Sequence, residues 1–451
     1  MTSRIVLLLA AFLAFAVPCA AQTLTVRTLP GGATLIVSQE PDAETVVIEA
    51  FFRVGVADEN AAGESGLTAL LARTWAGGGG TNRLPRQIAR DIGRFGSFGV
   101  HQSPDYLELW TISGYAESEI AAQTLLQNVV AAPLFLPASV ESAKREMARD
   151  RIVRGDSLGE AAETVLRARV FALSPDGRDP LGDAQNTHSL TNVALRRFYD
   201  RTVGKDARRA VFVVAGRMGA DEAERLVKSC LAAGDWAALR ENGDAEAKAK
   251  PAVADTVPAN LKPFDTRRPS PTRLSVTGYI APGTTEGADL YAMLCVLDAV
   301  MGGGKDCRLF ALRDRVLESE PAIGYDISSR IHWGREQSLW TVTVSGVNGS
   351  AKTATDRVIA ACRAAGLGGS SPVTADELVR AKAWLIGKHR QNRQRLADRA
   401  SALGAAQVMG IGASFEADYE ARIGAVTLDD VQSLSGRVFG ANAATVTTGS
   451  E

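Results

Sequence analysis

Apolar positions along the chain follow two alternating periods, which predict a succession of strands and helices. Runs rich in β-branched and aromatic residues predict strands, and Pro30, Gly31 and Gly32 turn the first run into a hairpin. Apolar residues spaced three and four apart predict amphipathic helices between the strands. In the first part of the chain the predicted strands are 24–38 (the hairpin), 45–55, 105–114 and 207–218, and the predicted helices are 66–75, 84–96, 117–133 and 137–155.

The same order of elements returns in the second part of the chain. The predicted strands there are 272–283, a pair within 322–346 and 444–449, and the predicted helices are 288–302, 308–318, 375–410 and 427–440. Two halves of about 200 residues with one order of elements indicate an internal duplication at the level of architecture. We therefore predict an α+β fold made twice, each half an α/β sandwich of one sheet and its helices.

A change of composition separates the two halves. Residues 236–271 are charged and rich in alanine and proline, with little periodicity, so we interpret them as a linker. This assignment places the first domain at residues 22–235 and the second at 272–451.

The first 21 residues carry the features of a secretory signal peptide. Arg4 provides a positive start, Ile5–Val17 is an apolar run, and small residues precede a cleavage site between Ala21 and Gln22. Cys19 offers a lipid-anchored alternative, which the preceding proline makes the less favoured one. The apolar run is shorter than the roughly 20 residues of a membrane span. We expect an exported, periplasmic protein with no integral membrane segment after cleavage.

Composition and charge narrow the classes of function. Apolar residues make up 46% of the chain, enough for sizeable cores, and the formal net charge is −1. A balanced charge provides no basic surface for nucleic acid, so we expect no nucleic-acid partner. The cysteines that follow the leader are scattered without CxxC spacing, which argues against a disulfide framework.

Residues 63–83 read GESGLTALLARTWAGGGGTNR and join a short helix to a run of four glycines. Leu67, Leu70 and Leu71 recur at core-facing spacing, while Ala69 and Arg73 lie one turn apart on a neighbouring face. This stretch, the hairpin and strand before it, and the later segments VMGGGKDCRLFALRDR and AIGYDISS resemble the M16 peptidase family, in particular its two-half processing-peptidase branch (M16B). The resemblance extends over essentially the whole chain after the leader and implies two homologous metalloprotease-like halves.

The resemblance also implies a zinc site that this chain lacks. The family signature HxxEH places two histidines one helical turn apart to hold zinc, with a glutamate between them as general base. In this sequence the three functional positions are Ala69, Ala72 and Arg73. A methyl group offers no lone pair, and a guanidinium is a cation that repels the metal. We predict that the chain binds no metal and has no cofactor of its own.

Other positions of the family's site are changed as well. The register of its third ligand, a glutamate, falls on Arg149–Arg151, where Asp150 is the only carboxylate, and that of its substrate-contacting asparagine falls near Gly99. No two histidines lie within one helical turn of each other; they are His101, His188, His332 and His389. We interpret His101 as a solvent-exposed loop residue, the alternative being a neighbour of the cleft.

Two residues of the second half match positions that the family uses in catalysis. There an arginine and a tyrosine polarise the substrate carbonyl and steady the oxyanion, a role for preorganised donors. Arg313 in LRDR and Tyr325 in IGYDIS match them, although the gap between the two is longer here than in the family. The alternative is a surface arginine on an amphipathic helix and a strand tyrosine packed in the core.

Two glycine-rich stretches have structural explanations. Gly77–Gly80 follows the degenerate helix, and we interpret it as a helix C-terminal turn, the alternative being a mobile loop that faces substrate. The GGGK stretch at 302–305 lacks the spacing and the βαβ context of a phosphate-binding loop. We expect it to cap the helix at 288–302.

Loss of the zinc motif beside matching Arg313 and Tyr325 favours a pseudo-peptidase. We predict a non-catalytic subunit that pairs with an HxxEH-bearing chain around a peptide substrate, with zinc held only in that partner. Arg313 and Tyr325 would then assist the partner's site. The alternative is a non-enzymatic structural or peptide-binding protein with the same fold. An independent hydrolase is a third reading, for which the stretches SGRVFG and GGSSPV do not satisfy the GxSxG nucleophile motif.

Overall fold

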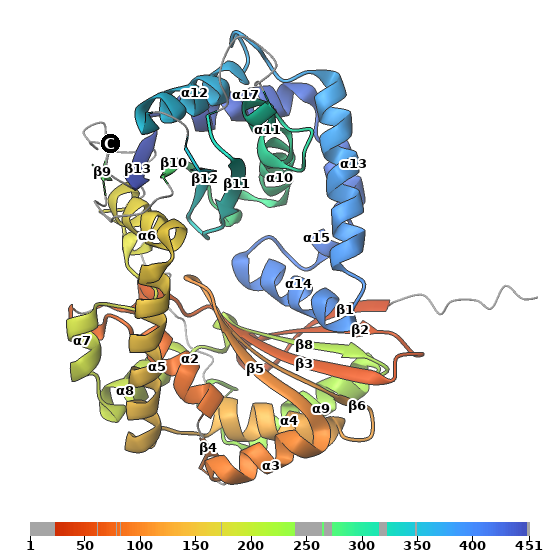
Figure 1. Cartoon of the computed structure of the whole chain (residues 1–451). Coiled ribbons are helices and arrows are strands. Elements are labelled where there is room, and N and C mark those ends of the chain that lie inside the picture. The colour runs from red at the N-terminus through yellow and green to blue at the C-terminus, as the bar shows by residue number, and fades with distance from the viewer. Residues whose placement is uncertain are drawn as a thin grey trace, which may run out of the picture.

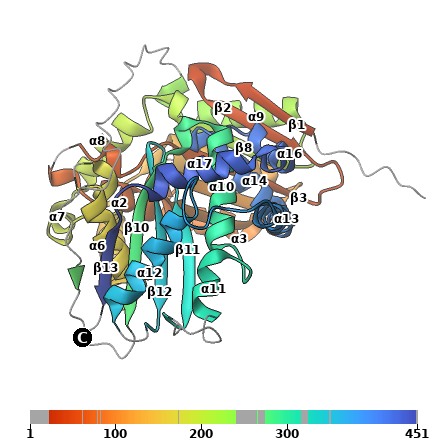
Figure 2. The same ribbon diagram turned by 90° about the horizontal axis from the view of Figure 1, so that it is seen from above.

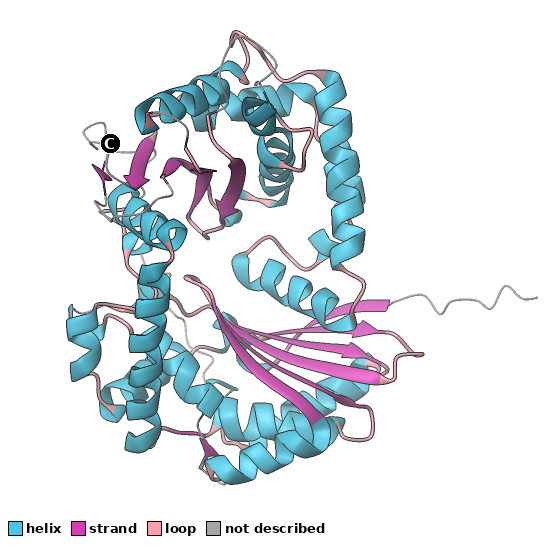
Figure 3. Ribbon diagram, in the orientation of Figure 1, coloured by secondary structure: helices cyan, strands magenta, loops and turns pink. Residues whose placement is uncertain are grey.

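The computed structural model of the chain describes two mixed sheets, each covered by helices (Figures 1 and 3). The described residues are 23–60, 62–77, 79–81, 83–172, 174–239, 264–265, 273–314, 323–347 and 350–448. The predicted signal peptide and most of the predicted linker lie outside these residues. The predicted α+β fold of two halves is confirmed.

The first sheet has six strands in the order β1-β2-β8-β3-β6-β5. They are β1 (Thr23–Thr28), β2 (Thr34–Gln39), β3 (Thr45–Phe52), β5 (Gly96–Gln102), β6 (Leu107–Gly114) and β8 (Ala210–Gly216). β2 and β8 run parallel, and the other neighbours run antiparallel. All of β8 is buried, because helices cover both faces of the sheet at its centre.

Helices of the first half lie mainly on one face of this sheet and beside it. They are α2 (Leu67–Gly77), α3 (Pro85–Phe95), α4 (Ser118–Ala122), α5 (Pro137–Asp156), α6 (Leu158–Val170), α7 (Ala184–Ser189), α8 (Asn192–Thr202) and α9 (Ala220–Ala233). The predicted helix at 117–133 continues beyond α4 as the wider π-helical segment Gln123–Ala131. The short strands β4 (Gly79–Gly80) and β7 (Pro133–Leu134) pair antiparallel.

The second sheet has five strands in the order β11-β12-β10-β13-β9. They are β9 (Phe264–Asp265), β10 (Leu274–Pro282), β11 (Asp326–His332), β12 (Gln337–Ser345) and β13 (Ala444–Thr448). The helices of the second half are α10 (Ala288–Gly302), α11 (Arg308–Asp314), α12 (Ala351–Ala364), α13 (Ala375–Asn392), α14 (Leu396–Met409), α15 (Ser414–Ala417), α16 (Tyr419–Ala425) and α17 (Leu428–Phe439).

The two sheets share one topology over four strands. The order β8-β3-β6-β5 of the first sheet matches the order β13-β10-β12-β11 of the second, and in both sheets these neighbours run antiparallel. The internal duplication seen in the order of elements is therefore present in the sheets themselves.

The halves exchange one helix each. α14, from the second half of the sequence, packs on the first sheet, where Ala400 and Leu403 join a buried cluster with Phe51 and Val213. α6, from the first half, packs on the second sheet through Leu166 and lies beside β13 and β10 in both views (Figures 1 and 2). Each half thus completes the core of the other.

This exchange corrects one predicted element. The helical stretch expected at 375–410 is two helices, because the chain turns at residues 393–395 to carry α14 down to the first sheet. Arg399 stabilises the turn by donating to the carbonyl oxygens of Arg393 and Gln394, at 2.9 and 2.8 Å. Strand β5 and helix α6 were not predicted. No helix among the described residues has the length and apolar character that a membrane crossing needs.

Candidate functional site

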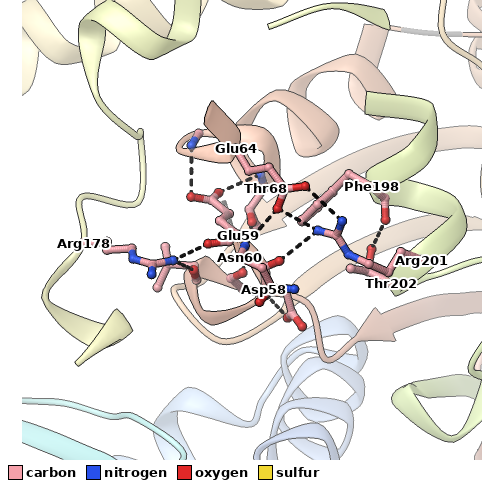
Figure 4. Close-up of polar contacts among 12 residues, drawn as sticks. Asp58, Glu59, Asn60, Glu64, Thr68, Arg178, Phe198, Arg201 and Thr202 are labelled. Atoms are coloured by element: carbon pink, nitrogen blue, oxygen red, sulfur yellow. Dashed lines mark hydrogen bonds and ion pairs between the residues drawn. The ribbon is translucent and has the colours of Figure 1, made fainter. Parts of the chain in front are cut away.

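A buried glutamate holds the start of α2, the helix that carries the degenerate motif. The Glu59 carboxylate accepts hydrogen bonds from the backbone N–H groups of Gly66 and Thr68, at 3.0 Å each (Figure 4). These are donors that the first turn of a helix leaves open. Burial raises the pKa of Glu59, and the two N–H bonds oppose that rise. Contacts within the chain therefore fix the position of α2.

Two arginines from neighbouring segments form hydrogen bonds to the loop before α2 (Figure 4). Arg178 donates to the carbonyl oxygens of Val56 and Glu59. Arg201 of α8 contacts both carboxylate oxygens of Glu64, at 2.9 Å each. Two-point guanidinium–carboxylate contacts fix direction as well as distance, so the loop enters α2 along a defined path.

The three positions of the zinc signature have different surroundings. Ala69 and Ala72 are buried, with exposed fractions of 0% and 4%, and both belong to the core of the first half. Arg73 is half-buried and lines a cleft with a volume of about 550 Å³. Only one of the three signature positions therefore presents a polar side chain to the cleft.

Arg73 forms an ion pair with Asp150, the one carboxylate in the register of the family's third ligand. Both Nε and Nη2 of Arg73 donate to Asp150 Oδ2, the Nε contact at 3.2 Å. Arg73 Nη1 also donates to Gln102 Oε1 at 3.2 Å and to the Ala69 carbonyl oxygen at 3.3 Å. This set of contacts joins α2, α5 and β5 at one point.

These residues do not fit a zinc ion. Ala69 and Ala72 provide no donor atom, and the guanidinium of Arg73 places a positive charge against the carboxylate of Asp150. Among the residues that the structure describes, no three His, Cys, Asp or Glu side chains gather as a metal-ligand group. We therefore derive no metal chemistry from this site.

The cleft beside Arg73 has both polar and apolar walls. It is lined by Ala72, Arg73, Val100, His101, Gln102, Asp150, Val153, Arg154, Glu160, Pro180 and Leu181. His101 is exposed, as interpreted, but it lies on strand β5 rather than in a loop, and it borders the cleft, as the alternative proposed. Partial burial lowers its pKa. Val153 of α5 is 70% exposed at the cleft wall. The cleft thus presents charged groups and exposed apolar surface side by side.

A smaller cavity of about 260 Å³ adjoins the cleft and shares Arg154, Glu160 and Pro180 with it. Its walls come from both halves of the chain, since α6 supplies Arg167 and the second sheet supplies His332 and Leu339. The two spaces therefore run from the degenerate zinc position toward the junction of the halves.

Arg313 and Tyr325 lie together, but neither is among the residues that line the cleft or the adjoining cavity. The Arg313 guanidinium carbon lies 5.4 Å from the centre of the Tyr325 ring and 5.1 Å from that of Phe310. Tyr325 is 75% exposed, so it is not a core tyrosine. Whether the pair acts in catalysis stays a prediction.

Gly99 occupies the register of the family's asparagine, but packing explains it. A Cβ atom added there would lie 2.2 Å from the Trp110 ring across the strand pair. His389 stacks on Tyr419 and contacts Glu416 at 3.1 Å, and His188 is exposed in the last turn of α7.

Gly79 and Gly80, which follow α2, are closely packed. A Cβ on Gly80 would lie 2.4 Å from the Asn128 carbonyl oxygen, and Gly79 and Gly80 pair with β7. Gly77 is the last residue of α2, as the interpretation as a C-terminal turn requires. Gly303 caps α10 by donating to the Ala299 carbonyl oxygen at 3.0 Å, as expected for the GGGK stretch.

One stretch that satisfies the GxSxG spacing escaped the sequence reasoning. It is GDSLG at residues 155–159, which joins α5 to α6. Ser157 is the N-cap of α6, and its Oγ accepts a hydrogen bond from the Glu160 backbone N–H. A nucleophile elbow needs a strand before the serine, whereas here a helix precedes it.

Sequence reasoning also missed Gln102, which connects Arg73 to the opposite wall of the cleft. Its amide accepts from Arg73 and donates to the Pro180 carbonyl oxygen at 2.9 Å. The strand that carries it reads GSFGVHQ, too poor in apolar alternation to signal a strand. The position of Gln102 follows from pairing with β6.

Comparisons with known proteins concern a segment of the sequence and the fold of the whole chain. Residues 189–385 match the family model described as Peptidase M16 inactive domain. No curated protein matches the chain. Among solved structures, a protease from Helicobacter pylori has a TM-score of 0.80 at 16% identity, over 95% of this chain and 100% of that one.

Two further structures share the fold. A peptidase M16 inactive domain from Pseudomonas fluorescens has a TM-score of 0.76 at 18% identity, and a putative M16-like peptidase from Alicyclobacillus acidocaldarius has 0.75 at 15%. Each comparison covers 95% of this chain and 98% of the other.

Fold and site together define a metallopeptidase-like protein of two halves whose metal positions hold no ligand set. Residues 189–385 are thus similar to the inactive domain of M16 peptidases, and the chain shares the fold of the M16-like structures over 95% of its length. The matched model is described as an inactive domain, and Ala69, Ala72 and Arg73 stand in the register of the zinc signature outside that matched segment.

Proposed function

We propose that this protein is the non-catalytic subunit of an exported, two-chain metallopeptidase of the processing-peptidase branch. In this proposal it pairs with an HxxEH-bearing chain, which alone holds zinc, and the two enclose a peptide substrate. The leader at residues 1–21 supports export to the periplasm.

The ion pair between Arg73 and Asp150 is the observation that carries the proposal. It fills the metal position with a paired cation while the cleft of about 550 Å³ beside it stays open. A site that loses its chemistry but keeps its cleft is suited to holding a peptide for a partner's zinc. Exposed apolar surface at Val153 supports peptide contact in the same cleft.

In this proposal Arg313 and Tyr325 act on the partner's site rather than on this chain's own cleft. Their mutual contact and the high exposure of Tyr325 leave both side chains available to a second chain. A guanidinium and a phenol can donate to a developing oxyanion once the partner positions the scissile carbonyl.

Co-expression with an HxxEH-bearing chain tests the proposal. We expect the two co-expressed chains to hydrolyse peptide faster than the HxxEH-bearing chain alone. Arg313→Ala in this chain is expected to lower the kcat of the complex at least about ten-fold. Arg380→Ala, which removes an exposed arginine paired with Asp306, is the matched control. Unchanged hydrolysis by the Arg313→Ala pair would exclude the catalytic contribution.

A second candidate is a non-enzymatic structural or peptide-binding protein with the M16 fold. Arg313 contacts Tyr325 outside the lining of the described cleft and cavity. This favours the second candidate, because a pair in that place can be explained by its mutual contact without any role in catalysis. Partner dependence separates the two candidates: a chain that binds peptide alone and never adds activity to an HxxEH partner fits only the second.

A further inference from the structure

The cavity of about 260 Å³ at the junction of the halves contains a guanidinium with few partners. Arg167 of α6 lines it, and its hydrogen bonding among the described residues consists of one long contact, from Nη1 to the Asp176 carbonyl oxygen at 3.5 Å. No carboxylate of the described residues lies within ion-pair distance of it. A guanidinium has five N–H donors, so most donors of this cavity-lining group have no acceptor among the described residues.

The acidic groups near Arg167 are Glu163, Asp176, Asp179 and Asp105; of these, Asp105 is buried and accepts a hydrogen bond from the Arg335 backbone N–H, and the other three have contacts elsewhere. Glu163 lies one helical turn before it and directs its carboxylate to His332, at 3.6 Å from Nε2. The Asp176 carboxylate accepts from the Ser174 hydroxyl at 2.9 Å. Asp179, on the same wall, pairs with Arg154. Arg167 is therefore the cation of this cavity whose geometry is best placed to receive a carboxylate.

The lining also explains which kind of carboxylate fits. Glu160 and Glu163 face the same space, so a compact polyanion such as phosphate would meet two negative charges beside Arg167. The end of a peptide carries one carboxylate for Arg167 and backbone N–H groups that can donate to Glu163. The cavity adjoins the cleft through Arg154, Glu160 and Pro180, so a peptide in the cleft can extend into it.

We propose that this cavity binds the C-terminal carboxylate of a peptide held in the cleft, with Arg167 as the anion-binding residue. The inference rests on the proposed peptide-holding function and specifies its substrate class: peptides with a free C-terminus. Because α6 belongs to the first half and His332 to the second, a peptide anchored here contacts both halves at once.

The test compares two pools of mixed-sequence hexapeptides, both N-terminally labelled with fluorescein, one with a free C-terminus and one amidated. Binding to the full mature chain is followed by fluorescence anisotropy. A charge-assisted two-point contact predicts binding of the free-acid pool about ten-fold tighter than the amide pool. The preference is expected to disappear in Arg167→Gln and to persist in Arg197→Gln, an exposed arginine on α8.

The outcomes separate this inference from the function on which it rests. Equal binding of both pools to the wild-type chain, or an unchanged preference in Arg167→Gln, overturns the C-terminal anchor and leaves peptide binding intact. If neither pool binds, peptide holding and the anchor both fail. Arg167→Lys keeps the charge but not the fork, so a reduced preference there supports the anchor even if the glutamine variant unfolds.

Discussion

At the scale of single residues, the site shows how an intramolecular ion pair can take the place of a metal centre. Arg73 carries a positive charge to the position where the family holds zinc, and Asp150 meets it from α5. Gln102 adds a contact from β5. One guanidinium thus joins the three elements, and the loop at Glu59 fixes the direction of α2.

Removal of this ion pair should cost stability to a modest extent. Arg73→Met is expected to lower the free energy of unfolding by about 1 kcal/mol, since the pair is partly exposed and partly screened by water. In a double-mutant cycle, Asp150→Asn should add little once Arg73 is gone. Urea unfolding of the single and double variants measures both losses of stability. Arg149→Met, an exposed neighbour on α5, is the control, and additive losses from positions 73 and 150 would contradict the pairing.

At the scale of elements, α14 and α6 define the packing that distinguishes this fold from two independent sandwiches. α14 covers the open face of the first sheet, where Glu108 of β6 is buried and accepts from the Ser401 hydroxyl of α14 at 3.0 Å. Burial raises the pKa of Glu108 to about 7. The contact between this helix and the sheet is therefore sensitive to pH.

The sign of the pH effect follows from that shift. The folded chain keeps the Glu108 proton up to about pH 7, whereas the ordinary pKa is 4.5. Protonation of Glu108 therefore adds to the free energy of unfolding. This contribution is complete below the ordinary pKa and is lost as the pH rises through about 7, a change of about 3 kcal/mol. In Glu108→Gln the fall in the free energy of unfolding between pH 5 and pH 8 should be smaller than in the wild type. Glu146→Gln, exposed on α5, should match the wild type; an unchanged fall in Glu108→Gln would be evidence against this origin.

Sequence patterns predicted most elements because their apolar residues face one side of a sheet or helix. The strand at 45–55 and the helix at 427–440, which Thr427 caps, are examples that the structure matches closely. β5 was missed because its two glycines and polar ends break the alternation, and Gly99 is dictated by the Trp110 ring across the sheet. The break between α13 and α14 was missed because α14 packs on the first sheet, and the local sequence does not reveal that contact.

The same limit applies to the site. The signature positions 69, 72 and 73 and the register of Asp150 came from the resemblance to the M16 family, laid onto this sequence. Their contact, and the part that Gln102 has in it, required the tertiary fold. The cavity around Arg167 and His332 joins residues 165 positions apart, so no local pattern could have indicated it.

At the scale of the whole molecule, the exchange of α6 and α14 makes the two halves one folding unit. The first sheet alone would expose Ile36, Val47, Phe51 and Val213, all now buried under α14. The second sheet would lose Leu166 from its own buried cluster. The cavity at the junction depends on the α6 exchange, since its walls combine Arg167 of α6 with His332 and Leu339 of the second half.

Expression of the halves separately tests this interdependence. A fragment of residues 23–239 is expected to aggregate or to lack cooperative unfolding, because its open sheet face leaves an extended apolar patch in water. Co-expression with residues 273–448 should restore solubility. Cooperative thermal unfolding of the first fragment alone, with native near-ultraviolet circular dichroism, would contradict the exchange as a requirement for folding.

Metal content of the purified mature chain tests the central claim most directly. After incubation with excess zinc and desalting, the account predicts far less than one zinc ion per chain and no chelator-sensitive peptide hydrolysis, because Ala69, Ala72 and Arg73 provide no ligand set. Retention of about one zinc ion per chain together with hydrolysis that a chelator abolishes would contradict it.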